Sequence, residues 1–504
     1  LSGKYVCNNS IIGNRKIDFI TKYFHAEKVK QQSTGRKNKQ HIYIIKFPEG
    51  TDIQKVINEY YSTNEIEYAE PDYIGSEGGV QGITPNDQYY TRQWSLKNDG
   101  SFSLSPAVTG ADIAMEDAWS IEQGDSNIVV GIIDSGSKLD HPEFGGRIWN
   151  NNDEIPNNGI DDDANGFIDD MQGWDFVNTD NDPTDDEGHG SNVSGIIGAN
   201  GNNADGYAGV DWNCKLMILK GIDNTGSGFY SWWTDAIYYA VDNGARVINM
   251  SLGGSSTSTT MQNAINYATL NNVVVVVCMM NTNSGVTYYP AGFPGVIAVG
   301  STNANDVRTH PFFWSASSGS NYGNHISVVA PGNYIYGLDH QSNTNYNYYW
   351  GGTSQATPHV TALAALLLAQ DNTRTAAQIK SIIESTAEDM VGDQTEDTPG
   401  WDQYYGYGRI NAHAALSAST NITSADVQNK NFLVYPNPSS QNFTVVVPSD
   451  SRQIEIFNSL GKLIQEKNTE GQTTQHFQLS DDGIYFIQIT TDKEILNSKL
   501  IVRK

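Results

Sequence analysis

Residues 128–136 (IVVGIIDSG) indicate the fold class of the central part of the chain. They form an almost continuous apolar run of strand length that ends in a carboxylate, Asp134. Three similar runs follow between helical segments, at residues 215–221 (KLMILKG), 246–251 (RVINMS) and 273–278 (VVVVVC). Apolar strands that alternate with helices predict an α/β fold whose mostly parallel sheet is covered on both faces. In such sheets the active site lies beyond the carboxyl ends of the strands.

Changes in composition divide the chain into three predicted domains. Residues 1–78 indicate a small α+β domain, with a strand at 41–47, a helix at 51–62 and a second strand at 66–69. A glycine-rich stretch at residues 75–82 (GSEGGVQG) is typical of a linker that proteases cut. Residues 79–420 hold the α/β pattern. Residues 430–504 contain short alternating strands separated by turn residues, which predicts a β-sandwich.

Charge and cysteine content exclude several function classes. The chain has 30 basic and 57 acidic side chains, a formal net charge of −27, so nucleic acid and anionic membranes are excluded as partners. Three cysteines are too few for a disulfide framework, and Cys214 and Cys278 lie in apolar runs as expected of buried thiols. No apolar run reaches the roughly 18 residues of a transmembrane segment. The chain opens on Leu-Ser-Gly, so we expect any secretory signal to have been removed.

Three short segments carry residue types suited to nucleophilic catalysis. Asp134 ends a buried strand, where a carboxylate is costly unless it is used. His189, in GHGSNVSGIIG, begins a helix of small residues that can pack tightly. Ser354, in GGTSQATP, begins an apolar helix, with Pro358 expected in its first turn, where the helix dipole favours developing negative charge. Taken singly, each has a structural alternative: a turn-capping Asp, a structural His and a helix-capping Ser.

Together, in the order Asp, His, Ser, these motifs resemble the subtilisin superfamily over roughly residues 85–417. The resemblance implies a subtilisin-like three-layer sandwich and a serine endopeptidase that acts on protein or peptide substrates. It makes Ser354 the nucleophile, His189 the general base and Asp134 the group that orients His189. It also implies that the side chain of Asn281 and the backbone N–H of Ser354 form the oxyanion hole.

The segment around the expected oxyanion residue departs from the family. Met280 stands where relatives usually have Gly, and Tyr288 where many have Gly at the floor of the specificity pocket. The facing wall is expected to be Ser251, Leu252 and Gly253. Two large side chains predict a small pocket, hence a preference for a residue such as Ala before the scissile bond, or weak activity; alternatively, Met280 turns into the core. Asn192 replaces a second family His, without an expected loss of activity.

Residues 161–169 (DDDANGFID) have the D-x-D-x-N-G spacing of a calcium loop. The position of the final EF-hand Glu is Gln172, so Asp170 or Asp175 is expected to supply the missing carboxylate. The alternative is a solvated acidic turn. The expected ligands are Asp161, Asp163, Asn165, the carbonyl of Phe167, Asp169 and Asp170. The family resemblance implies a second calcium ion, held by the side chains of Asp87, Glu143 and Asn203 and the carbonyls of Asp205 and Tyr207.

The flanking domains suggest how the enzyme is made and exported. Residues 41–73 resemble the family's propeptide, which implies a zymogen with an intramolecular inhibitor; the alternative is a permanent accessory domain. Residues 434–438 (VYPNP) and the strand at 499–504 resemble the C-terminal sorting domain of type IX secretion substrates. They imply recognition by the secretion machinery and a secreted or cell-surface protein, whereas a carbohydrate- or protein-binding module is the alternative.

A rival hypothesis from another function class also fits the sequence. The bulky Met279–Met280 pair beside Asn281 would suit a weakly active or inactive, calcium-ordered surface protein that uses a subtilisin scaffold for binding or adhesion. The survival of all four expected catalytic residues favours the enzyme.

Overall fold

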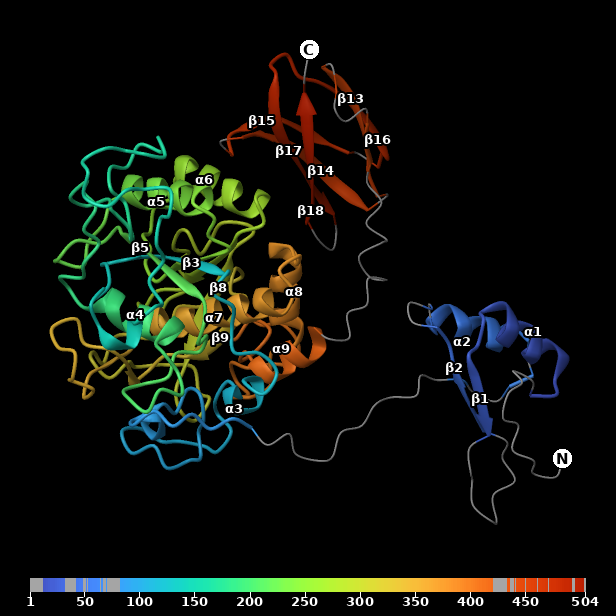
Figure 1. Cartoon of the computed structure of the whole chain (residues 1–504), viewed down its shortest axis with the longest axis horizontal. Helices are drawn as coiled ribbons and strands as arrows, with labels where there is room; N and C mark the ends of the chain where they lie inside the picture. The colour runs from blue at the N-terminus through green and yellow to red at the C-terminus, as the bar shows by residue number, and fades with distance from the viewer. Residues whose placement is uncertain are drawn as a thin grey trace. The chain divides into compact units, whose positions relative to one another are not determined.

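The computed structural model describes residues 82–419 continuously (Figure 1). It also describes residues 12–31, 42–48, 51, 53–63, 65–66 and 69, and most of residues 433–502. The chain divides into two compact units, Leu1–Val80 and Gln81–Lys504. Most of the linker expected at 75–82, most of the segment at 67–73 and the prolines of the 434–438 motif lie outside the described residues.

A seven-stranded sheet forms the centre of residues 82–419, and each of its neighbouring strand pairs is parallel. The order is β4-β5-β3-β6-β7-β8-β9. The strands are β3 (Val129–Asp134), β4 (Gly173–Asp175), β5 (Lys215–Lys220), β6 (Val247–Met250), β7 (Val274–Cys278), β8 (Ile297–Thr302) and β9 (Val328–Pro331). The parallel sheet expected from the apolar runs is confirmed.

Side chains that alternate along each strand fill two separate apolar cores, one on each face of the sheet. Val130 and Ile132 join the core that is covered by α4 (His189–Gly198), α7 (Thr353–Gln370), α8 (Ala376–Ser385) and α9 (Ala412–Ser419). Ile133 joins the other core, covered by α5 (Tyr230–Asp242) and α6 (Thr259–Leu270). Figure 1 shows α5 and α6 on one side of the sheet and α7 on the other. The three-layer arrangement is therefore confirmed.

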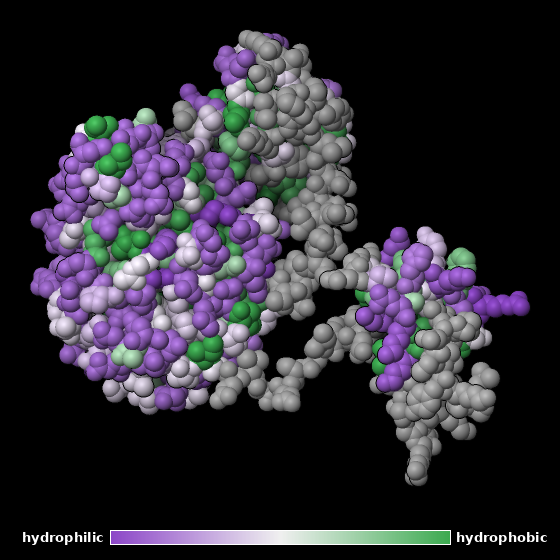
Figure 2. All heavy atoms as spheres, viewed as in Figure 1, coloured by the Kyte–Doolittle hydropathy of each residue, from purple (hydrophilic) through white to green (hydrophobic). Residues whose placement is uncertain are grey.

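Short elements surround the sheet and complete the layers. They are the helices α3 (Met115–Ala118), η1 (Tyr90–Arg92) and η2 (Pro142–Phe144) and the hairpin of β10 (Ile335–Tyr336) and β11 (Tyr349–Trp350). Figure 2 shows a mainly hydrophilic face on this part of the molecule, with hydrophobic side chains in small groups. Among the residues that the structure describes, no helix is both long and apolar enough to cross a membrane.

The C-terminal residues form two antiparallel sheets around a separate apolar core, as the alternating pattern predicts. One sheet contains β12 (Leu433–Tyr435), β13 (Asn442–Val446) and β16 (Thr474–Gln478). The other contains β14 (Ser451–Asn458), β15 (Leu463–Asn468), β17 (Gly483–Thr491) and β18 (Ile495–Val502).

The N-terminal unit is α+β, as expected. Helices α1 (Arg15–Tyr23) and α2 (Ile53–Ser62) share a small core made by Ile17, Ile20, Val56 and Tyr60. Strands β1 (Lys28–Gln31) and β2 (Tyr43–Lys46) pair antiparallel. The strand at 41–47 and the helix at 51–62 were predicted, whereas α1 and β1 were not. The strand predicted at 66–69 is wrong for its two described residues, 66 and 69, neither of which is in a strand.

Candidate active site

The carboxyl end of β3 and the first residue of α4 bring a carboxylate and an imidazole together. Asp134 is the last residue of β3 and is fully buried. Its Oδ1 lies 2.7 Å from Nδ1 of His189 and also accepts the backbone N–H of Ser135 at 2.8 Å. A carboxylate on Nδ1 orients the ring and favours the tautomer in which Nε2 is free to accept a proton.

The imidazole of His189 is held on several sides. Its ring packs edge-on against Trp350, with ring centroids 5.4 Å apart, and its backbone N–H donates to Glu187. Burial by itself would lower the pKa of His189, but the negative charge of Asp134, with Glu187 and Asp185 beyond it, raises the pKa above its ordinary value. This electrostatic setting stabilises the imidazolium.

Glycines let α4 approach the loop that follows β3. A Cβ on Gly190 would lie 2.0 Å from the carbonyl oxygen of Gly136, a contact that is not possible. Gly188, at the N-cap of α4, has a φ of 112° that favours glycine. The close approach of α4 to Gly136 is what places His189 beside Asp134.

Ser354 is the second residue of α7, and its hydroxyl points toward the residue that follows β6. Its Oγ donates to the carbonyl of Ser251 at 3.2 Å, and Ser251 Oγ donates to the carbonyl of Ser354 at 2.8 Å. No hydrogen bond joins Ser354 to His189 in the structure, although both residues are described. A hydrogen bond from Ser354 to Nε2 of His189 would require the Ser354 hydroxyl to rotate away from the carbonyl of Ser251.

Pro358 lies in the second turn of α7, not in the first turn as the sequence suggested, because α7 begins at Thr353. Proline has no N–H to donate to the carbonyl four residues earlier, which here belongs to Ser354. That carbonyl is consequently available to Ser251 Oγ. The proline thus permits the contact between the start of α7 and the residue after β6.

Ser251 is positioned by a buried hydrogen-bond network through Asn249, which the sequence analysis missed. Asn249 in β6 is fully buried, donates from Nδ2 to Ser251 Oγ at 3.1 Å and accepts from Thr361 Oγ1 of α7 at 2.8 Å. An amide inside an apolar strand was the available signal, because a buried amide needs partners.

Asn281 and the start of α7 supply two donors to one small region. Asn281 Oδ1 accepts from the backbone N–H and the hydroxyl of Thr353, at 2.8 and 3.0 Å, which leaves Nδ2 as the group that can donate. A Cβ on Gly352 would lie 3.1 Å from that Nδ2 and 3.5 Å from the Ser354 backbone nitrogen. The two nitrogens thus border the same space, as an oxyanion hole requires.

Met280 lies against the expected wall of the specificity pocket. Its φ of 71° is in the left-handed region, which glycine adopts more readily. A Cβ on Gly253 would lie 3.2 Å from Met280 Sδ, and Cys278 Sγ lies 3.6 Å from the same sulfur. The side chain of Met279, in contrast, is buried in the core. The sulfur of Met280 therefore lies against Gly253, the residue expected to form the facing wall of the pocket.

The other expected pocket residues are positioned by pairing between two loops. Ser251 and Leu252 are buried after β6. Gly254 and Tyr289 exchange two backbone hydrogen bonds, of 2.9 and 2.8 Å. Tyr288, the residue before Tyr289, is therefore held near the segment that contains Ser251, Leu252 and Gly253. The described contacts do not join the Tyr288 side chain to Met280. Asn192, also buried, accepts a long hydrogen bond of 3.4 Å from Gln355 and so links α4 to α7.

The acidic loop gathers some of its expected ligands and adds one. Carboxylate oxygens of Glu154, Asp161 and Asp163 lie within 4.8 Å of one another. Glu154 is almost fully buried and was missed, because it precedes the D-x-D pattern. Asn165 donates from Nδ2 to both Asp163 and Asp170, each at 3.0 Å, which joins Asp170 to the group.

The remaining expected residues of this loop have other contacts. The carboxylate of Asp169 accepts the backbone N–H groups of residues 158 and 159. Phe167 packs its ring edge-on against Trp174 and Tyr239. Asp175 accepts from the backbone of residues 177 and 178, so it serves a turn. Asp170, rather than Asp175, is therefore the carboxylate that Asn165 links to the Glu154, Asp161 and Asp163 group.

The second expected calcium site contains a buried carboxylate oxygen without a partner. Asp87 accepts the N–H of Asn202 on Oδ2, whereas its buried Oδ1 has no hydrogen-bond partner among the described residues. Glu143 accepts from Asn203 Nδ2 at 3.0 Å. Burial and the charges of Asp205 and Asp87 raise the pKa of Glu143 to about 7. Asp205 is exposed and Tyr207 is buried. Crowded buried carboxylates of this kind fit a cation.

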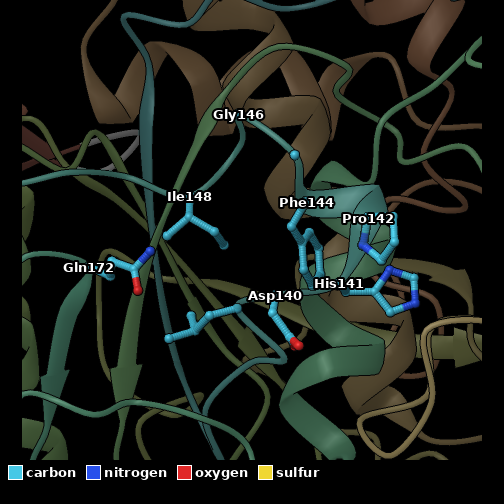
Figure 3. Close-up of a pocket in the computed structure, with 9 residues that line it drawn as sticks. Asp140, His141, Pro142, Phe144, Gly146, Ile148 and Gln172 are labelled. Carbon is cyan, nitrogen blue, oxygen red and sulfur yellow. The ribbon is translucent and has the colours of Figure 1, made fainter.

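A pocket of about 390 Å³ lies along the loop that follows β3. Figure 3 shows Asp140, His141, Pro142, Phe144 and Ile148 around it. None of the proposed catalytic side chains lines this pocket, so we assign it no part in catalysis.

Comparisons with known proteins show the family of the chain. Residues 125–408, more than half of the chain, match the model of the subtilase family. The chain belongs to the subtilase family. It is 35% identical over 368 residues to a thermophilic serine proteinase of Bacillus sp. (strain AK1), covering 73% of this chain and 76% of the relative. It is 34% identical to thermitase of Thermoactinomyces vulgaris, over 66% of this chain and 99% of the relative.

Solved structures include a protease from Pseudoalteromonas arctica PAMC 21717 with a TM-score of 0.50 and 29% identity. The similarity covers 67% of this subtilase and 100% of that chain. This subtilase is accordingly a subtilisin-like serine endopeptidase, and the comparisons give no support to the non-catalytic adhesion protein.

The two described cysteines, Cys214 and Cys278, are free and buried, as predicted.

The C-terminal β-sandwich matches a second family model. Residues 433–503 match the secretion system C-terminal sorting domain. The subtilase is therefore an exported enzyme, either secreted or held at the cell surface, which confirms the location expected from the sequence.

Proposed function

We propose that this subtilase cleaves peptide bonds with Ser354 as nucleophile, His189 as general base and Asp134 as the residue that orients His189. The observation that carries the proposal is the 2.7 Å contact between His189 Nδ1 and Asp134 Oδ1 at the carboxyl edge of the sheet. Ser354 Oγ attacks the scissile carbonyl while its proton passes to Nε2 of His189. The same proton then goes to the leaving amine, and a water molecule hydrolyses the acyl-enzyme by the reverse sequence.

Asn281 Nδ2 and the Ser354 backbone N–H are the proposed oxyanion donors. Both are fixed before substrate arrives, since Thr353 occupies Oδ1 of Asn281 and α7 fixes the Ser354 backbone. Losing one such donor costs about 3–4 kcal/mol of barrier, a range that was measured on subtilisin itself. The N281A variant should therefore lose roughly 10²–10³-fold in kcat.

Covalent labelling with a fluorophosphonate probe tests the catalytic proposal directly. The wild type should react at Ser354, S354A should not react, and D134N should react about 10⁴-fold more slowly because the imidazole tautomer is wrong. S255A, which removes an exposed hydroxyl from the loop after β6, is the matched control and should react normally. A wild type that does not label, or an S354A variant that does, would contradict the proposal.

Substrate preference follows from the position of Met280. We propose that its side chain narrows the pocket against Gly253, so that a small residue such as Ala is favoured before the scissile bond. Cleavage of a peptide library tests this preference, and selection of Phe or Leu at that position would contradict it.

Two calcium ions are proposed to stabilise the fold. The first would be held by Glu154, Asp161, Asp163 and Asp170, and the second by Asp87, Glu143 and Asn203, with carbonyl oxygens completing each set. An ion at either site would neutralise the clustered carboxylates and, by binding several of them, would hold the loops that carry them together. E154Q should lower the number of bound ions by one, whereas D153N, at the exposed neighbour, should not. Equal calcium content in the two variants would contradict the first site.

The N-terminal unit is proposed to be an inhibitory propeptide, and the C-terminal domain to be read by type IX secretion machinery. Support for the first comes from the α+β unit that precedes the catalytic part. If maturation is autocatalytic, S354A should accumulate as the full chain, while the wild type is cut near residues 75–82. Mass spectrometry of the N-termini distinguishes these outcomes, and an S354A chain that matures normally would contradict self-processing.

A further inference from the structure

The segment that carries Asn281 leaves the sheet after β7 and is held by hydrogen bonds to residues 319–321. Met280 and Asn283, on either side of Asn281, have positive φ angles of 71° and 51°, so this segment is not a regular strand. The carbonyl of Asn281 accepts the backbone N–H of Gly319 at 3.1 Å, and the N–H of Asn283 donates to the carbonyl of Gly319 at 2.9 Å. The backbone position of Asn281 therefore depends on residues 319–321.

One buried guanidinium joins these two segments. Arg308, which follows β8, is only 6% exposed. Its Nη1 donates to the carbonyl of Ser320 at 2.7 Å and to Oδ1 of Asn283 at 2.9 Å. This nitrogen carries two hydrogens, so both bonds can form together. Arg308 thus fixes the distance between the segment that carries Asn281 and the segment that supports it.

The loop that follows α8 holds the other side of the same guanidinium. Glu396 accepts from Nε and Nη2 of Arg308, at 2.9 and 2.7 Å, in a bidentate ion pair. The rings of Tyr322 and Tyr404 have their centroids 5.4 and 5.3 Å from the guanidinium carbon. A lysine carries a point charge on a flexible stem and cannot reproduce this planar set of contacts.

We propose that Arg308 is a positioning residue for Asn281 and that Glu396 orients Arg308. This inference rests on the proposed function, in which Asn281 is an oxyanion donor. Such a donor acts only if its Nδ2 lies at hydrogen-bond distance from the developing charge. Thr353 fixes the Oδ1 end of the Asn281 side chain. Arg308 supplies the second anchor, on the backbone from which that side chain extends.

Replacing Arg308 should lower kcat through Asn281. A shift of about 1 Å can cost roughly 10²-fold in rate, and the loss should not exceed the roughly 10²–10³-fold that one oxyanion donor contributes. We therefore expect R308Q to lower kcat roughly 10–100-fold and to change KM less than about 3-fold. R308K keeps the charge but not the planar fork, so it should resemble R308Q.

A double-mutant cycle with N281A separates positioning from general support of the fold. Kinetics are measured on a peptide p-nitroanilide that the wild type cleaves, below the Tm of every variant. In the N281A background the amide to be positioned is gone, so R308Q should change kcat less than about 2-fold. An equal loss of kcat in both backgrounds would overturn the role of Arg308. An N281A variant with the kcat of the wild type would instead contradict the oxyanion role itself and overturn this inference with it.

Two further variants complete the test. R147Q is the matched control: Arg147 is also buried and donates to the carbonyls of Gly198 and Asp211, and none of its described contacts reaches residues 280–284. Its effect on kcat should be the same with and without N281A. If R308Q does not fold, E396Q replaces it, since the Glu396 side chain is 27% exposed. E396Q should lower kcat several-fold in the wild type and not in N281A, and an equal loss in both would overturn the proposal.

Discussion

The charge of Glu187 acts on His189 without being part of its proton-transfer chemistry. His189 must be neutral to accept the proton of Ser354, so kcat/KM should rise with pH through the His189 pKa. Negative neighbours raise that pKa, and Glu187 is one of them. E187Q removes the charge but keeps an acceptor for the His189 backbone N–H, so the acid limb of the pH profile should move to lower pH. D182N, at an exposed acid of the same loop, is the control, and coinciding profiles for E187Q and wild type would contradict this.

Met280 has a left-handed backbone conformation, and its side chain is proposed to narrow the pocket. M280G should relieve the left-handed φ and open the pocket against Gly253. We expect kcat/KM for Phe before the scissile bond to rise roughly 10-fold relative to Ala, without loss of thermal stability. M279G is the comparison, because it removes core volume instead and should mainly destabilise. An unchanged order of preference in M280G would refute the obstruction.

Single functional residues were predictable where they stand in a short, characteristic sequence motif. Asp134, His189 and Ser354 stand in short motifs that carry their own context, so their placement at one edge of the sheet could be expected. The position of Glu154 could not be predicted. It lies seven residues before Asp161 in sequence, and only the turn between them brings its carboxylate beside those of Asp161 and Asp163. The Ser251–Ser354 pair was also missed, since it depends on a hydrogen bond that Pro358 cannot make.

At the scale of elements, α4 fixes the geometry of catalysis by its distance from the loop after β3. A methyl group on Gly190 would meet the Gly136 carbonyl at 2.0 Å, so G190A must push α4 away. A shift of about 1 Å can cost roughly 10²-fold in rate, and overpacking costs about 1–3 kcal/mol of stability. G198A, on the same helix, meets side-chain atoms rather than backbone, a Leu216 methyl at 3.0 Å and Arg147 Nη2 at 3.3 Å, and should do much less harm. Equal kcat values in the two variants would show that α4 does not set the distance.

Elements with strong apolar patterns were predictable, and those without were not. The runs that became β3, β5, β6 and β7 are buried on both faces and stood out in the sequence. β4 has only three residues, β15 is mostly exposed, and β16 (TQHFQ) is made mostly of polar residues, so they lack an apolar signal. Their pairing partners decide that they are strands, and sequence periodicity alone does not reveal partners.

At the scale of the whole molecule, calcium is expected to contribute to stability as a ligand of the native state. An ion present at 100 times its dissociation constant adds about 2.7 kcal/mol per site, which raises Tm by several degrees. Chelation of the S354A chain should therefore lower its Tm by ~5 °C or more, and added calcium should restore it. A Tm that does not change on chelation would contradict both proposed calcium sites.

The three-layer fold was predictable at the scale of the whole molecule, but the domain boundaries stay a prediction.

The hydroxyl of Ser251, just after β6, donates to the carbonyl of Ser354, the proposed nucleophile, and Ser251 is also an expected substrate-binding residue. Substrate residues several positions before the cut bond would contact the segment that contains Ser251. Through the Ser251–Ser354 hydrogen bond, these contacts would affect the position of Ser354 Oγ. We therefore expect longer peptides to raise kcat more than they lower KM, and S251A to weaken that length dependence. Measuring both constants over substrates of two to six residues checks this; a gain seen only in KM would mean that distant contacts merely hold the substrate.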